Sequence, residues 1–119
     1  MPRVQALIDA GFSVREAHAL TGANAVAVSA AGSDQAGATL LAADNNLITT
    51  ATADQGVRLP ASWIAGDIWV CNGTSVNVFV YPVVGGKLNN ETANAPLTLP
   101  AGRAAICKAV SATQCFVQF

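Results

Sequence analysis

This chain has few charged residues. Asp, Glu, Lys and Arg make up 11% of its 119 residues, against roughly 25% in typical soluble proteins. The basic residues are scattered from Arg3 to Lys108 without forming a cluster, so we expect neither a nucleic-acid interface nor electrostatic binding to a membrane. No apolar run approaches the roughly 20 residues that span a bilayer. The N-terminus lacks the apolar core of a signal peptide, so we expect synthesis in a cytoplasm.

Residues that commonly carry catalysis or bind metals are scarce as well. His18 is the single histidine, and neither GxSxG nor HExxH frames it. The three cysteines form no CxxC pair and lie in apolar runs. We therefore expect each cysteine to be a small buried hydrophobic residue, and we expect no metal site. They are Cys71, Cys107 and Cys115, and a Cys107–Cys115 bridge stays open if their strands pair. Most carboxylates lie beside turn residues. The sequence therefore predicts no enzyme and no cofactor.

Few charges also suggest that other protein covers much of the surface. The hydrophobic fraction is 52%, and a chain this short has a large surface for its volume. Large apolar surface marks interaction sites. The competing explanation is that Ser, Thr, Asn and Gln supply the surface polarity. We expect an assembly.

Residues 1–22 differ from the rest of the chain. Val4, Leu7 and Ile8 recur at helical spacing between Pro2 and Gly11, and a capping-box pattern follows. Two short helical turns or an extended arm are both compatible with this segment. Isolated helices shorter than about 12 residues are marginal. The segment is therefore expected to dock on this domain or on a neighbouring subunit.

Residues 23–119 are predicted to form one β-domain. Short runs of β-branched and aromatic residues alternate with Gly, Asn and Pro turn signals. The predicted strands cover residues 24–30, 39–42, 45–53, 56–60, 66–71, 76–82, 95–100, 103–110 and 114–119. This spacing predicts an all-β fold, a small antiparallel β-sandwich or barrel of jelly-roll type, preceded by the N-terminal arm or short helices.

The stretch "SVNVFVYP" has apolar residues on both sides of a strand. Val76, Val78 and Val80 point one way, whereas Phe79 and Tyr81 point the other way. The dipeptide Asn72-Gly73 predicts a hairpin turn before this strand. The hairpin pairs Trp69 with Val78, pairs Cys71 with Val76 and has two apolar faces. We expect these faces to bury against other subunits.

The aromatic residues allow two interpretations. Trp63, Trp69, Phe79 and Tyr81 could form a platform for a sugar, since aromatic faces stack on apolar surfaces. Packing in the core and between subunits is the favoured interpretation. Trp63 lies in an apparent turn with no evident core to enter, so a subunit contact is expected for it.

Three segments carry a resemblance to a known module: "GVRLPASWIAGDIWVCNGTSVNVFVYPVVGGKLN", "LPAGRAAICKAV" and "QCFVQF". They resemble a structural module of tailed-bacteriophage virions, which occurs in head decoration (cement) proteins and in head or tail fibre proteins. The resemblance covers about Gln35 to Phe119 and is weakest before Gln55. The chain departs from the pattern at Trp63, Cys71 and Cys115. The resemblance implies a virion structural role, no catalytic residues, and a symmetric homo-oligomer, with a trimer expected.

These observations lead to three functional hypotheses. The first is a decoration protein on the capsid exterior, made in the host bacterial cytoplasm, which binds the major capsid protein and stabilises the shell. Its expected interface residues are Val4, Leu7, Ile8, Trp63, Trp69, Val78, Phe79 and Tyr81. The second is a receptor- or glycan-binding fibre-tip domain, which should show an elongated stalk or repeats, and this chain has neither. The third is a virion-attached glycan hydrolase, which needs converging carboxylates.

Overall fold

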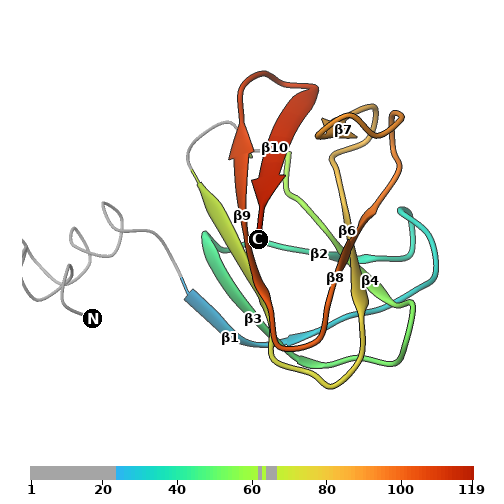
Figure 1. The fold of residues 1–119 in the computed structure, drawn as a ribbon, viewed down its shortest axis with the longest axis vertical. Helices are drawn as coiled ribbons and strands as arrows, with labels where there is room; N and C mark the ends of the chain where they lie inside the picture. Colours follow the sequence, from blue (N-terminus) through green and yellow to red (C-terminus); the bar gives the residue numbers. More distant parts are fainter. Residues whose placement is uncertain (1–23, 62, 64–66) are drawn as a thin grey trace, which may run out of the picture.

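The computed structural model describes residues 24–61, 63 and 67–119, and these form strands joined by turns, without an α-helix (Figure 1). The strands are β1 (Asn24–Ser29), β2 (Thr39–Leu40), β3 (Asn45–Thr50), β4 (Gly56–Arg58), β5 (Ile68–Asn72), β6 (Val78–Tyr81), β7 (Lys87–Leu88), β8 (Leu97–Leu99), β9 (Ala104–Ala109) and β10 (Gln114–Gln118). Each predicted strand has a counterpart among them, and β7 was not predicted. The predicted arm, residues 1–22, lies outside the described residues.

The strands form two sheets, and the chain alternates between them. Sheet A has six strands in the order β1-β3-β5-β9-β10-β7, and sheet B has four in the order β2-β4-β6-β8. From β1 to β6, each strand pairs in parallel with the strand two places along the chain. The path is a β-solenoid of about 4 turns. The all-β prediction is therefore confirmed, whereas the antiparallel, jelly-roll-like sandwich or barrel is wrong.

The physical reason for this correction lies in the connections. Parallel strands cannot be joined by a tight hairpin and need a crossover. In this chain the strand in the opposite sheet serves as the crossover, so the turns between strands are short even though the pairing is parallel. Asn24 therefore lies beside Asn45, and Asn45 lies beside Trp69 in the next coil.

The predicted hairpin between residues 68–71 and 76–82 is also wrong. β5 pairs with β3 and β9 in sheet A, whereas β6 pairs with β4 and β8 in sheet B. Asn72, which is buried, directs this crossover. Its Nδ2 donates to the carbonyl oxygens of Val76 (2.8 Å) and Leu99 (3.1 Å), and its Oδ1 accepts from the backbone and hydroxyl of Thr74. The side chain thus ties the turn to sheet B, and Trp69 does not face Val78.

The last turn of the solenoid runs in the opposite direction. β8 pairs antiparallel with β6, and β9 pairs antiparallel with β5. β10 then forms a hairpin with β9 and pairs in parallel with β7. The C-terminal strand is therefore held in sheet A, as its apolar sequence predicted. The solenoid therefore ends in antiparallel pairs, and β7 and β8 are the edge strands of the two sheets at this end.

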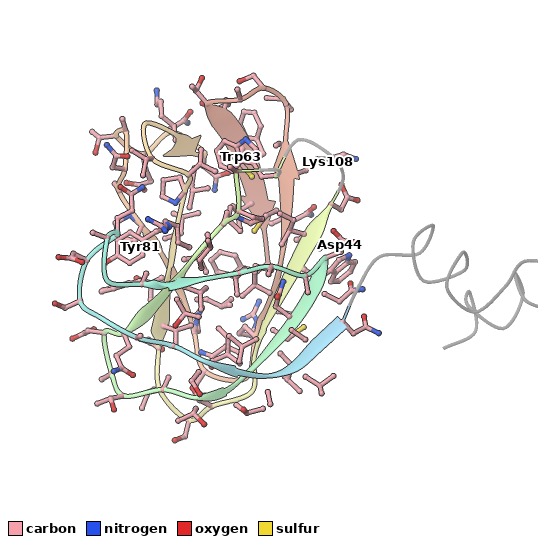
Figure 2. All side chains as sticks on the ribbon, turned by 180° about the vertical axis from the view of Figure 1, so that it is seen from behind. Asp44, Trp63, Tyr81 and Lys108 are labelled. Atoms are coloured by element: carbon pink, nitrogen blue, oxygen red, sulfur yellow. The ribbon has the colours of Figure 1, made fainter. Side chains whose placement is uncertain are left out.

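The core between the sheets contains the inward side chains of both. Val78 and Val80 are 0% and 1% exposed, so the predicted alternation of this strand is confirmed. Tyr81 points outward yet is 5% exposed, and it lies over Gly56, where a Cβ would be 2.6 Å from the ring. Gln35, in the loop after β1, donates to the carbonyl oxygen of Pro82. The chain's own loop after β1 thus lies against this end of the strand, near Tyr81 (Figure 2).

Candidate interaction surface on sheet A

The outer face of sheet A carries the exposed apolar side chains that strand alternation directs away from the core. In β5, Ile68 and Val70 are buried, whereas Trp69 is 42% exposed. In β10, Cys115 is buried and Phe116 is 52% exposed. The same alternation operates in β3, where Ile48 is buried. Period-two patterning in each strand therefore presents a second, outward set of apolar residues.

The register of the sheet brings this outward set together. Trp69 lies between Asn45 on β3 and Ile106 on β9, and Lys108 lies beside Phe116. One step further along the strands, Cys71 lies between Leu47 and Ala104. We call this set the apolar patch; its members are Leu47, Trp69, Cys71, Ala104, Ile106 and Phe116. None of them is charged, and they come from four adjacent strands.

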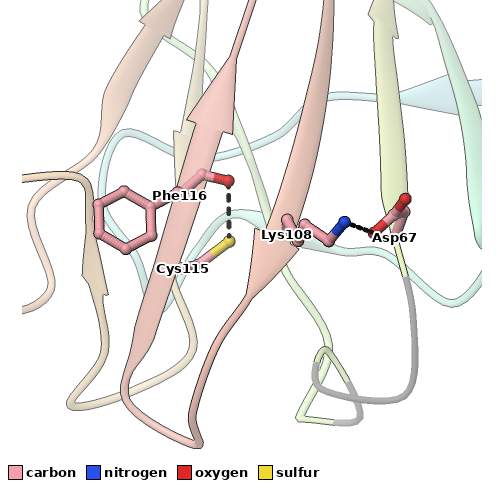
Figure 3. Close-up of polar contacts among 4 residues, drawn as sticks. All are labelled: Asp67, Lys108, Cys115 and Phe116. Carbon is pink, nitrogen blue, oxygen red and sulfur yellow. Dashed lines mark hydrogen bonds and ion pairs between the residues drawn. The ribbon is translucent and has the colours of Figure 1, made fainter.

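Polar groups border the apolar patch. Lys108 Nζ lies 4.0 Å from Asp67 Oδ1 (Figure 3), and Lys108 is the register partner of Phe116. Both side chains are largely exposed, so this ion pair contributes under about 1 kcal/mol. On the opposite side, Asn45 Nδ2 donates to Asn24 Oδ1 at 2.9 Å. An apolar centre with a polar rim is the usual anatomy of a protein–protein interface.

A hollow of about 350 Å³ adjoins the apolar patch at Phe116. Ile106 and Phe116 provide its apolar wall, and Asp67 and Lys108 provide its charged edge. A protruding side chain of a partner could enter it.

The predicted interface residues are distributed over different parts of the molecule. Trp69 lies in the apolar patch. Phe79 is half-buried on the outer face of sheet B, with its ring edge-on to that of Tyr81 at 6.2 Å. Val78 and Tyr81 are buried within the subunit, so they expose little surface to a partner. The remaining predicted interface residues that precede β1, Val4, Leu7 and Ile8, lie outside the described residues.

Trp63 lies in the core, although the sequence offered no core for it. Its side chain is 1% exposed, and a Cβ on Gly86 would lie 2.8 Å from its ring. Its Nε1 is buried and has no hydrogen-bond partner among the described residues. The four aromatic residues considered as a sugar platform therefore do not share one face, because Trp63 is internal and Trp69 is on sheet A.

Three members of the apolar patch were not among the predicted interface residues: Leu47, Ile106 and Phe116. The alternation of "QCFVQF" was sufficient to place Phe116 opposite Cys115 on its strand. What the sequence did not reveal was the strand order that brings β3, β5, β9 and β10 together. The correct partners of Trp69 depend on that order.

The three cysteines occupy two environments. Cys107 and Cys115 are buried and unbridged on the inner side of the β9–β10 pair. A hydrogen bond between their thiols, in which Cys107 donates, and burial both raise the pKa of Cys107. Cys115 Sγ also contacts the Phe116 carbonyl oxygen at 3.7 Å (Figure 3). Cys71, by contrast, is half-buried within the apolar patch. No group of three or more metal-ligating side chains occurs within residues 24–61, 63 and 67–119.

Two further findings concern membrane spans and similarity to known proteins. In the part of the chain that the structure describes, no helix has the length and apolarity to cross a membrane. Comparison with protein-family models, curated proteins and solved structures found no match.

Proposed function

We propose that this chain is a decoration protein of a tailed-phage head, which attaches to the capsid exterior through the apolar patch and strengthens the shell. The observation that supports this proposal best is the patch itself: an uncharged area with Trp69 at its centre on the outer face of sheet A, bordered by polar groups. An exposed apolar area of this kind marks a site of interaction with protein. The resemblance of residues 35–119 to virion modules supports the major capsid protein as the proposed partner.

The mechanism is adhesive. Trp69 is the anchor, because a large aromatic at the centre of an interface contributes more than residues at its rim. Packing the outer face of sheet A against the shell removes apolar side chains from water. It leaves the Asp67–Lys108 pair at the edge, where solvent still reaches both charges. No buried charge needs a partner on the shell, which avoids a penalty of several kcal/mol per ion.

Assembly into a homo-oligomer, for which we propose a trimer, multiplies this contact. Linked binding sites gain affinity without new contacts when all can engage at once. Weak attachment by each subunit then gives firm attachment of the oligomer. Such a contact, repeated over the shell, resists expansion by internal pressure.

A receptor- or glycan-binding fibre-tip domain is the second candidate. The exposed rings of Trp69 and Phe116 favour it, because aromatic faces stack on the apolar faces of sugars. The coils of the solenoid also provide the structural repeats that the sequence lacked. Those repeats remove one argument against a fibre protein.

Copy number and binding together test the proposal. Particles assembled without this chain should take it up from solution until its copy number is comparable to that of the major capsid protein. The decorated shells should retain DNA at higher temperature than bare shells. Uptake of only a few copies per particle, or attachment abolished by free host polysaccharide, would support the fibre-tip function instead.

A further inference from the structure

Asn72-Gly73 is the one Asn-Gly dipeptide in the sequence, and the fold requires both of its residues. Gly73 follows β5, where a Cβ would lie 2.9 Å from the carbonyl oxygen of Ile48 and 3.1 Å from the Leu47 side chain. A larger residue at this position would therefore push against the backbone of β3. Asn72 ties the turn to sheet B through its side-chain amide. The chain thus has to place these two residues next to each other.

An Asn-Gly pair is chemically unstable in an unfolded chain. Asparagine is a thermolabile residue, and glycine places no side chain beside the backbone nitrogen that attacks it. In this reaction the Gly73 nitrogen forms a bond to Asn72 Cγ, and the bond from Cγ to Nδ2 breaks. The proton lost by the Gly73 nitrogen passes to Nδ2, which leaves as ammonia. The resulting cyclic imide takes up water and opens to aspartate or isoaspartate.

The fold restrains both reacting groups. The Gly73 N–H donates to the carbonyl oxygen of Ile48 at 2.9 Å, so the nitrogen can lose its proton only when that bond breaks. Asn72 Oδ1 accepts from the backbone (3.0 Å) and hydroxyl (2.6 Å) of Thr74. Its Nδ2 donates to three carbonyl oxygens, those of Val76 (2.8 Å), Leu99 (3.1 Å) and Pro100 (3.2 Å). Attack would make Cγ tetrahedral and displace both side-chain atoms from these bonds.

We propose that Asn72 is a deamidation site that folding switches off, and that deamidation of an unfolded chain prevents it from refolding. In the product, an acidic oxygen takes the place of Nδ2. That oxygen would face the carbonyl oxygens of Val76, Leu99 and Pro100, which have no hydrogen to donate. The side chain is 2% exposed, so water would not solvate the new charge. Burying a charge against acceptors is strongly unfavourable.

Isoaspartate would disturb the turn further. It inserts an additional carbon into the backbone, so Gly73 would no longer lie where its N–H meets the Ile48 carbonyl oxygen. A chain that folds promptly therefore keeps its amide, whereas a chain that stays unfolded loses the ability to fold with time. The dipeptide thus limits how long an unfolded chain remains able to reach the native state.

Peptide mass spectrometry measures the reaction directly. The full-length protein is incubated at mildly alkaline pH, either native or unfolded in guanidinium chloride, and then digested with trypsin. Cleavage after Arg58 and Lys87 releases one peptide that contains both Asn72 and Asn77. Conversion of Asn72 should be at least about a hundredfold faster in the unfolded chain, because the native reaction has to wait for local opening. Asn77 precedes the β-branched Val78 and is the internal control, which should keep its amide in both samples.

Refolding measures the consequence. After dilution from denaturant, the fraction of chains that recover the native circular dichroism should fall in proportion to the fraction deamidated. Gly73→Ala, kept in denaturant, should convert far more slowly, and its steric effect on the fold is irrelevant there. Asn72→Asp should unfold at much lower denaturant concentration than the wild type. Asn77→Asp makes the same exchange at an exposed position and should unfold with the wild type.

Either of two results would overturn the proposal. Equal conversion of Asn72 in the native and the unfolded protein would show that the fold does not protect the dipeptide. Full refolding of deamidated chains, or wild-type stability of Asn72→Asp, would show that the turn tolerates the product. Protection in the native state, together with a loss of refolding that follows conversion, is the expected result.

Discussion

Replacing Trp69 with alanine should weaken attachment to the capsid strongly. The side chain is 42% exposed in the isolated subunit, and a large aromatic buries about 150–250 Å² when fully covered. Roughly 100 Å² of it thus remains available to a partner. At about 25 cal/mol per Å², that area contributes about 2.5 kcal/mol. Since about 1.4 kcal/mol changes a dissociation constant tenfold, the loss per subunit is between about tenfold and a hundredfold.

The assay is a titration of particles assembled without this chain, followed by sedimentation and quantification of the bound protein. Val84→Ala is the matched control, because Val84 is 73% exposed but lies in the turn after β6, outside the apolar patch. The control should bind as the wild type does. Because Trp69 is not part of the core, unfolding of the variant should occur at nearly the same temperature as in the wild type.

Equal binding of the Trp69→Ala and Val84→Ala variants would refute the reasoning. It would mean that sheet A faces solvent on the particle and that another surface makes the contact. Loss of oligomerisation with retained particle binding by the monomer would assign the patch to the subunit interface instead.

Three further predictions concern the core, the thiols and the nature of the contact. Trp63→Ala should lower the free energy of unfolding by about 3–5 kcal/mol in urea titrations, and an unchanged midpoint would contradict its place in the core. A thiol reagent should label Cys71 first in the native protein and Cys107 and Cys115 only on unfolding, because burial protects those two and the pKa of Cys107 is raised; particle binding should slow the labelling of Cys71, and simultaneous reaction of all three would disagree with the burial. Raising salt from about 0.1 M to 1 M, which shortens the Debye length from about 10 Å to 3 Å, should leave the protein on the particles, whereas urea should release it. Release by salt alone would show that ion pairs carry the attachment.

Local patterns in the sequence were sufficient to place every strand except β7 (Lys87–Leu88), but not to order them. The alternation in "VNVFVYP" and "QCFVQF" depends on the two-residue period of a strand, which any sheet shares. Pairing depends on the geometry of the turns. Asn72-Gly73 has the composition of a hairpin turn, yet the Asn72 side chain bonds to Leu99 and Val76 and leads the chain to the other sheet. A dipeptide pattern does not include such distant acceptors.

The sequence alone did not reveal the solenoid, because its coils differ in length. Val57 lies beside Thr39 in one coil and beside Val80 in the next, so these sheet-B positions recur at different intervals in the sequence. Asn45 and Trp69 are stacked in sheet A although their side chains differ in kind. Stacking requires inward side chains that fill the core, not identical ones. Without a fixed period, the repeat appears in the backbone and not in the sequence.

The unlike ends of the solenoid determine where the fold can be lengthened. At the end opposite β1, β8 is the edge strand of sheet B and runs opposite to the other strands of that sheet, so a further coil of the same hand has no parallel strand to stack on there. At the β1 end, each added coil would present the same parallel edge as the one before it. Inserting coils before Asn24 should therefore lengthen the molecule by a fixed amount per coil, while the antiparallel turn stays at the far end. The same unit could then serve alone on a shell or as the final segment of a long, rigid fibre.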